Sequence, residues 1–254
     1  MLPRPYIGIT GFMTGREVTM AAEEIPTGAT HDLMAGILVS SKTLRGEQNK
    51  RPNRYPTIEN ANRIPLFHRR VFTVVHYNTK EPDTLGEQLR EIQRCFRSLI
   101  EGIQLNMAWP NPLELIPFCV KTPQYKIILQ IGAWAFEKID NSPQKLVERI
   151  KGRYSGLVDY VLLDMSGGEG IVMDRKNIDR YLEALYGAGV HEQVRIGIAG
   201  GLDPENVGEV VRPFATRYPN LCVDAEGRIR DENDHLDIAK AKQYLRAAYA
   251  TFQS

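Results

Sequence analysis

Short apolar runs recur along the chain, and polar or turn-forming residues separate them. Few of these runs alternate apolar with polar residues, so they are typical of strands that a parallel sheet buries on both faces. The sequence predicts strands at residues 6–10, 35–39, 71–76, 102–105, 126–131, 160–164, 195–199 and 221–223.

Segments with helical signals lie between the expected strands. In residues 83–100 the apolar positions Leu85, Leu89, Ile92 and Phe96 follow a spacing of three or four residues. Ser142 before Pro143 is a typical N-cap with proline at the first helical position. Further helices are expected at residues 174–185, from residue 203 onward, and at 234–252.

Regular alternation of strands and helices predicts parallel strands with right-handed crossovers. Eight such units in a chain of 254 residues fit a closed barrel better than an open sheet. We therefore expect an α/β fold, a single (β/α)8 TIM barrel that forms one domain over residues 1–254. An inserted basic loop, residues 40–56, follows the second strand and should lie over the active face. This loop could serve as a lid or as a site for an acidic partner.

Composition narrows the class of protein. The net charge of +1 gives no general attraction to nucleic acid or acidic lipid. The first residues lack the apolar core of a signal peptide, and no apolar run is long enough to span a membrane. Three cysteines, an odd and small number, favour reduced thiols and a cytoplasmic protein. We expect no nucleic-acid or membrane partner, no resident metal and no cofactor.

Three successive strands end in residues suited to ligand binding. Asp164 closes the sixth strand and precedes the glycine-rich stretch Gly167, Gly168, Glu169 and Gly170. Gly200 and Gly201 follow the seventh strand, and Asp224, Ala225, Glu226 and Gly227 end the eighth. The carboxyl ends of parallel strands meet at one face of a barrel, where ligands bind. Glycines there let backbone N–H groups approach a phosphate.

These motifs, taken in order, resemble the phosphoribosylanthranilate isomerase family of (β/α)8 barrels. The family sequence S-G-G-L-x-P-E-N-V after strand seven is similar to residues 199–207, and L-L-D of strand six is similar to residues 162–164. Q-L-H of strand four resembles residues 104–106, V-D-V-S-S-G resembles residues 223–227, and R-Y resembles residues 54–55.

The resemblance implies an isomerase that acts on a phosphorylated, sugar-linked small molecule. It implies that Asp164 is the general acid, that Gly200 and Gly201 bind phosphate, and that Arg54 binds a substrate carboxylate. At the position of the family's cysteine base this chain carries Ile7, which cannot accept a proton. The substrate or the reaction is therefore expected to differ, with an isomerase or lyase that passes through an enol or imine as the favoured class.

Several alternatives remain open at this point. His76, at the end of the third strand, could replace the missing base. Glu226 would repel a phosphate unless it turns away or pairs with a cation such as Arg228. The carboxylates Asp164, Glu169, Asp224 and Glu226 could hold a divalent cation. A barrel that binds a small metabolite without catalysis and reports to a partner is the rival hypothesis, and a homodimer is also open.

Overall fold

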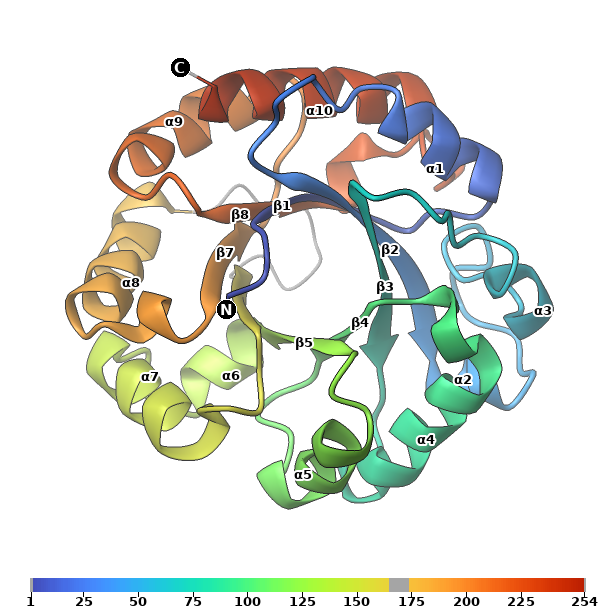
Figure 1. Cartoon of the computed structure of the whole chain (residues 1–254), viewed down its shortest axis with the longest axis horizontal. Coiled ribbons are helices and arrows are strands. Elements are labelled where there is room, and N and C mark those ends of the chain that lie inside the picture. Colours follow the sequence, from blue (N-terminus) through green and yellow to red (C-terminus); the bar gives the residue numbers. More distant parts are fainter. Residues whose placement is uncertain (1, 165–173, 254) are drawn as a thin grey trace.

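The computed structural model describes residues 2–164 and 174–253. Its strands close into a parallel barrel in the order β1 to β8, and β1 pairs with β8. The helices form a ring outside the strands (Figure 1). The predicted fold class, a single (β/α)8 barrel, is confirmed.

The strands agree closely with the apolar runs. Their bounds are β1 Tyr6–Thr10, β2 Asp32–Ser40, β3 Val71–Asn78, β4 Gly102–Asn106, β5 Lys126–Ile131, β6 Tyr160–Asp164, β7 Arg195–Ala199 and β8 Cys222–Ala225. β1, β5, β6 and β7 match the prediction residue for residue. β2, β3 and β4 extend further because their terminal polar residues still pair with neighbouring strands.

The helices begin at side chains that cap them. Thr14 forms a capping box with Glu17 at the start of α1, and Ser142 accepts a hydrogen bond from the N–H of Lys145 at the start of α7. The helices are α1 Gly15–Ala22, α2 Ser41–Leu44, α3 Ile58–Ala61, α4 Leu85–Phe96, α5 Pro112–Lys121, α6 Ala133–Glu137, α7 Pro143–Arg149, α8 Arg175–Gly187, α9 Val207–Arg217 and α10 Ile238–Phe252.

Two predicted helix starts are wrong. α9 begins at Val207 and not at Asp203, because the Asp203 carboxylate accepts hydrogen bonds from the N–H groups of Glu205 and Asn206 and forms a separate turn. α10 begins at Ile238, with Asp237 as its N-cap, and not at residue 234. Asp203 takes backbone donors into a turn ahead of α9, whereas Asp237 caps the first N–H groups of α10 itself.

The hydrophobic core consists of two layers separated by the strands. One cluster fills the space between strands and helices, and it includes Ile7, Ile9 and Leu33. A smaller cluster lies inside the barrel and includes Tyr6, Met34, Phe72, Tyr160 and Cys222. Side chains alternate between these layers along each strand.

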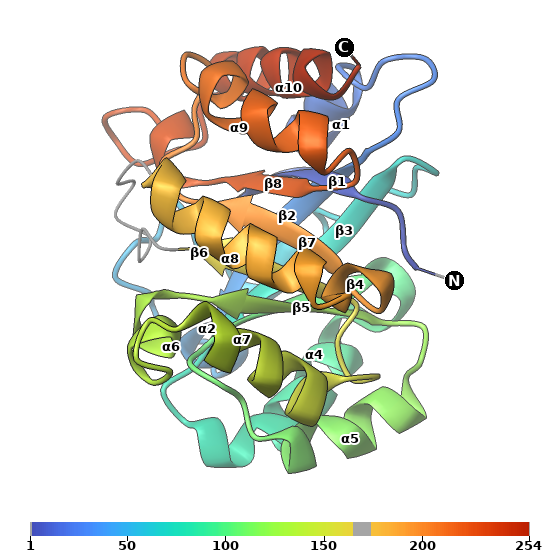
Figure 2. The ribbon, with the colours of Figure 1, turned by 90° about the vertical axis from the view of Figure 1, so that its left-hand side faces the viewer.

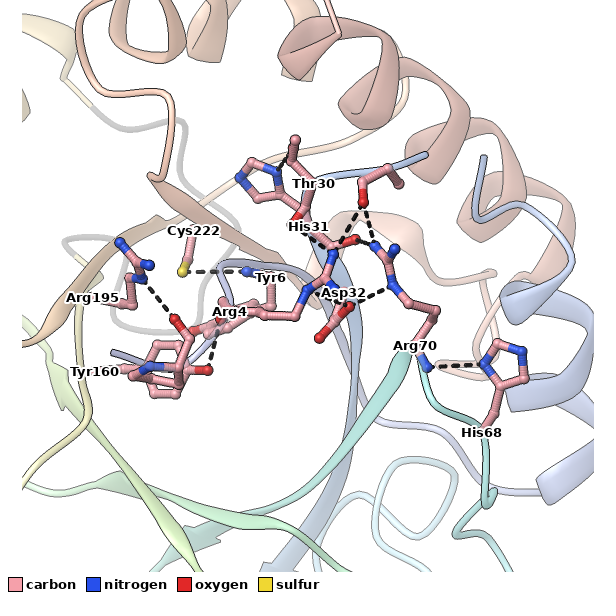
Figure 3. Close-up of polar contacts among 12 residues, drawn as sticks. Arg4, Tyr6, Thr30, His31, Asp32, His68, Arg70, Tyr160, Arg195 and Cys222 are labelled. Carbon is pink, nitrogen blue, oxygen red and sulfur yellow. Dashed lines mark hydrogen bonds and ion pairs between the residues drawn. The ribbon is translucent and has the colours of Figure 1, made fainter. Parts of the chain in front are cut away.

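The amino end of the barrel is closed by aromatic and ionic contacts. The rings of Tyr6 and Phe72 lie 5.2 and 5.6 Å from the ring of Tyr160. Around them, Asp32 forms ion pairs with Arg70 and Arg4 at 2.6 and 3.3 Å (Figure 3). The strands run away from this end, as the side view shows, and their carboxyl ends lie together on the opposite face (Figure 2).

Candidate active site

A ring of polar side chains forms the inner layer at the carboxyl end of the barrel. They follow the inward-facing apolar residues by two positions on their strands, as the two-residue period of a strand requires. All of them are buried: Thr10, His76, Gln104, Gln130, Asp164 and Asp224.

Gln130 on β5 joins three of these side chains. Its Nε2 donates to Oδ2 of Asp164 at 2.8 Å, and its Oε1 accepts from Nε2 of Gln104 at 3.0 Å. The same oxygen lies 2.9 Å from Nε2 of His76. Because an amide oxygen only accepts, this contact places the proton of neutral His76 on Nε2. Nδ1 of His76 is then an acceptor, and it has no hydrogen-bond partner among the described residues.

Asp224 is a buried carboxyl group with no cation partner among the described residues. Thr10 donates to both of its oxygens at 3.3 Å, and Gln104 donates at 3.5 Å. Burial, followed by the charge of Glu226, raises the pKa of Asp224 to about 8. The group therefore keeps its proton at neutral pH. The sequence analysis considered Asp224 as one of four carboxylates that could hold a divalent cation, and gave it no role in proton transfer.

The position aligned with the family's cysteine does not face this ring. Ile7 is fully buried in the cluster between strands and helices. A side chain added at its neighbour Gly8 would meet Met34 and Asp224 inside the barrel. Gly8 and Thr10 are thus the inward positions of β1 near the ring. Replacing Ile7 by cysteine would place the thiol against the helices.

The turn after β7 has the backbone shape that its glycines permit. Gly200 and Gly201 have φ values of +121° and +63°, which residues with a Cβ rarely adopt. Asn206 donates to the carbonyl of Gly201, and Asp203 pairs with Arg228 at 2.8 Å. The turn is therefore held from both sides, by the start of α9 and by the segment after β8.

Arg54 already has carboxylate partners from the protein. Its guanidinium lies 2.9 Å from Glu226 and within 2.6 Å of Asp234, and only 8% of the residue is exposed. Glu226 thus pairs with a cation, one of the two alternatives left open, but the cation is Arg54, because Arg228 bonds Asp203 instead. Arg54 also ties the basic loop to the carboxyl face, as predicted. The loop thereby lies against the segment that follows β8.

Two cavities open at this face, and they differ greatly in volume. The first, of about 30 Å³, is lined by polar side chains at the ends of β3 to β6 and by the turns after β7 and β8, with Gly200, Gly201, Ala225, Glu226 and Gly227. It has room for one or two water molecules. The second, of about 640 Å³, lies over β3 to β6. Gln130 and Asp164 line both cavities.

The structure brings most of the predicted residues together. Asp164, His76, Gly200, Gly201, Ala225, Glu226 and Gly227 line the smaller cavity, and Arg54 reaches it through Glu226. Gly167, Gly168, Glu169 and Gly170 lie outside the described residues. Within residues 2–164 and 174–253 no cluster of three or more metal-binding side chains is found. The sequence does not predict the contact between Gln104 and Gln130, because these residues meet only when the barrel closes.

The second half of the chain matches a family model. Residues 133–229 match the model described as N-(5'-phosphoribosyl)anthranilate (PRA) isomerase. An N-(5'-phosphoribosyl)anthranilate isomerase of Erythrobacter litoralis is 27% identical over 135 residues, which cover 50% of this chain and 58% of that protein. The chain resembles phosphoribosylanthranilate isomerase. The resemblance that the sequence motifs predict is thus confirmed.

Solved isomerase structures share the fold. TrpF from Jonesia denitrificans has a TM-score of 0.63 at 16% identity, covering 97% of this chain and 98% of that one. A phosphoribosylanthranilate isomerase in complex with reduced 1-(o-carboxyphenylamino)-1-deoxyribulose 5-phosphate has a TM-score of 0.61 at 19% identity, covering 98% of this chain and all of that one. No helix of the described part of this isomerase-like barrel is long and apolar enough to cross a membrane.

Proposed function

We propose that this isomerase-like barrel is an enzyme that acts on a phosphorylated, sugar-linked small molecule, with Asp164 as its acid and base. One observation carries the proposal. Of the described titratable residues that line the two cavities, Asp164 is the one shared by both. A ligand in either cavity would therefore lie next to this carboxyl group, which Gln130 holds at 2.8 Å.

The proposed reaction moves one proton from carbon to oxygen. Asp164 gives its proton to a ring or carbonyl oxygen, and that oxygen takes the electron pair of the C–O bond that breaks or of the C=O π bond. The resulting carboxylate then removes the proton from the adjacent carbon, which leaves an enol or enamine and restores the acid. Asp224 remains protonated at neutral pH. It therefore adds no negative charge that would oppose ionised Asp164.

His76 is the second candidate for the proton transfer. Its Nδ1 is a buried acceptor without a partner among the described residues, while Nε2 is held by Gln130. A substrate proton could be taken by Nδ1 and not by Asp164. Replacing His76 by alanine tests this alternative, since it should then lower turnover as strongly as replacing Asp164.

The phosphate is assigned to the turn of Gly200 and Gly201 and to the segment Ala225, Glu226 and Gly227. Support comes from the left-handed glycine backbone and from Arg228, whose side chain lies beside this turn. Binding there requires the small cavity to widen, and Glu226 must stay paired with Arg54 or move away. Gly167, Gly168 and Gly170 are also proposed to bind the ligand, because they follow Asp164 in the sequence.

The test compares wild-type protein with Asp164→Asn and with Glu87→Gln, an exposed carboxyl group on α4. We expect N-(5'-phosphoribosyl)anthranilate, or its ribulose product, to be converted by the wild type and by Glu87→Gln. Asp164→Asn should lose about 10²–10⁴ in kcat, the usual contribution of a positioned acid or base. Equal turnover by Asp164→Asn overturns the role of Asp164. No conversion by any variant overturns this substrate.

A non-catalytic metabolite-binding barrel is the alternative. It is favoured by Ile7, which faces the helices, and by Arg54, which the protein's own carboxylates occupy. This alternative predicts that ribulose 5-phosphate raises the melting temperature while no variant or wild-type protein shows turnover. Turnover separates the two hypotheses, and thermal denaturation with ribulose and ribulose 5-phosphate side by side tests the phosphate recognition that both require.

A further inference from the structure

A third cavity, of about 570 Å³, opens at the amino end of the barrel beside α4. It lies between the last turns of α4 and the segments that lead into β4 and β5. Asp164 is at the opposite end of the strands, and no residue of the family motifs lines this cavity. Its volume falls within the range of about 300–1,000 Å³ that is usual for ligand pockets. The cavity therefore has room for a small molecule away from the proposed active site.

Three arginines supply positive charge to this cavity. Arg90 and Arg94 lie one helical turn apart on α4, and Arg97 follows directly after the helix. Arg94 pairs with Glu91, but Arg90 and Arg97 form no ion pair within the described part of the chain. Like charges three or four positions apart on a helix repel each other. An anion bound between these side chains would remove that repulsion.

The carboxyl group in the lining does not neutralise these arginines. Oε2 of Glu101 accepts a hydrogen bond from the N–H of Thr73 at 3.1 Å, and Glu101 forms no ion pair with a described residue. Its own N–H donates to the carbonyl of Thr73 at 2.9 Å, and its carbonyl accepts from the N–H of Lys126 at 2.8 Å. Glu101 is thus fixed to β3 and β5, and the arginines keep their charge for a ligand.

Arg97 has a backbone conformation that a residue with a side chain rarely adopts. Its φ is +48° and its ψ is −127°. Glycine is the usual residue with positive φ after the end of a helix, yet a long cationic side chain stands here. The hydroxyl of Tyr125 donates to the carbonyl of Arg97, and the ring of Tyr125 stacks on Phe118. Strained residues that their surroundings hold in this way are common where ligands bind.

Helix polarity alone does not account for this arrangement. Cations near the end of α4 offset the partial negative charge of its last carbonyl groups. That effect is confined to the last turn, so it applies to Arg94 and Arg97 but not to Arg90, six residues before the last helical residue. It also gives no reason for positive φ at Arg97. A bound anion accounts for both features.

We propose that this cavity binds a small molecule with two neighbouring phosphate-type anionic groups, such as a diphosphate. The guanidinium groups of Arg90 and Arg97 each hold one anionic group through paired N–H donors. Side chains of Gln93, Ser98 and Gln124 line the same space and can donate to the remaining oxygens. The site is separate from the carboxyl face, and it does not rest on the proposed function.

The experiment compares pyrophosphate with inorganic phosphate by titration calorimetry on the wild-type protein. Pyrophosphate offers two anionic groups and phosphate offers one. We expect pyrophosphate to bind at least tenfold more tightly, because only pyrophosphate reaches both unpaired arginines at once. Equal affinity for the two probes would overturn the bridging of Arg90 and Arg97 by one ligand.

Paired variants locate the binding. Arg90→Ala/Arg97→Ala should weaken pyrophosphate at least tenfold. Arg180→Ala/Arg212→Ala removes the same charge from exposed positions on α8 and α9 and should change the affinity by less than about twofold. Equal weakening in both double variants would show attraction to the net charge alone. Unchanged affinity in Arg90→Ala/Arg97→Ala would place pyrophosphate elsewhere, and either result overturns the site.

Arg97→Gly separates a ligand-binding role from a structural one. Glycine adopts positive φ without strain, so the melting temperature of this variant should equal or exceed that of the wild type while pyrophosphate binds more weakly. Arg97→Ala keeps a Cβ in the same backbone conformation and should melt at a lower temperature than Arg97→Gly. A melting temperature of Arg97→Gly below that of the wild type would show that this side chain supports the fold, and would overturn the argument from strain.

Discussion

The two ends of the barrel differ in the partners of their buried carboxyl groups. At the amino end, Asp32 is balanced by Arg4 and Arg70, and the ring of Tyr160 fills the interior with its hydroxyl bonded to the carbonyl of Arg4 (Figure 3). At the carboxyl end, Asp224 is surrounded by neutral hydroxyl and amide donors. The ion pairs of Asp32 balance its charge and stabilise the closed amino end. A buried carboxyl group that has no cation beside it keeps its proton instead. The first arrangement suits stability and the second suits proton transfer.

The carboxyl face shows a second contrast, between its two sides. The side over β6 to β8 carries most of the motifs that resemble the isomerase family, yet the cavity beside its glycine turns holds about 30 Å³. The side over β3 to β6 carries only residues 104–106 and Asp164 of those motifs, and its cavity encloses about 640 Å³. Motif resemblance and available space thus point to different halves of the same face, and Asp164 lies where they meet.

The amino end should tolerate loss of a ring least well. Tyr160→Ala removes a ring that is 3% exposed, and should lower the free energy of unfolding by about 3–5 kcal/mol. Trp134→Ala at the carboxyl face removes a ring that is 74% exposed, and should change it by less than about 0.5 kcal/mol. Urea denaturation measures both. Similar losses in the two variants would contradict the division between the stabilising interior of the amino end and the carboxyl face that carries the proposed active site.

Asp224 should make the protein less stable as pH rises. Its pKa is raised from near 4 to about 8 on folding, so between these values the folded state binds a proton that the unfolded state has released. Its contribution is fully present below pH 4 and falls by up to about 1.4 kcal/mol per pH unit up to pH 8. Asp224→Asn should remove this decline. An unchanged pH profile would show that Asp224 ionises normally.

His31, at the amino end, should give the opposite slope. Burial lowers its pKa from 6.5 to about 4, so between these values the unfolded state binds the proton and the folded state does not. Stability therefore falls as pH decreases from 6.5 to 4, by up to about 1.4 kcal/mol per pH unit. His31→Gln should flatten this part of the profile and leave the decline above pH 6.5 intact. A profile altered only at high pH would refute the assignment.

Glu226→Gln should have a small effect on stability. Glu226 is partly exposed, and Arg54 keeps its contact with Asp234, so the loss should be about 1 kcal/mol. The change also removes a negative charge beside the glycine turns. Inorganic phosphate should then bind more tightly than to wild-type protein, as measured by calorimetry. Weaker phosphate binding would show that Glu226 supports this site.

The sequence by itself determined the barrel fold and the placement of Asp164 at the carboxyl end of a strand. Apolar runs and cap residues are local signals. Four strands match their apolar runs residue for residue, because strands buried on both faces have apolar residues up to their ends. The starts of α9 and α10 differ from the prediction, because the hydrogen bonds of Asp203 and Asp237 decide where each helix begins. The position of Asp164 at a strand end also followed from the chain alone.

Only the tertiary structure decided which side chains share the interior. Gln104, Gln130 and Asp164 come from different strands, and barrel closure sets their contacts. The orientation of Ile7 toward the helices depends on the register of β1 between β2 and β8, where a shift of one residue would exchange the two layers. The pairing of Arg54 with Glu226 spans 172 positions of the chain. Such contacts leave no local pattern, because their energy depends on neighbours that only folding supplies.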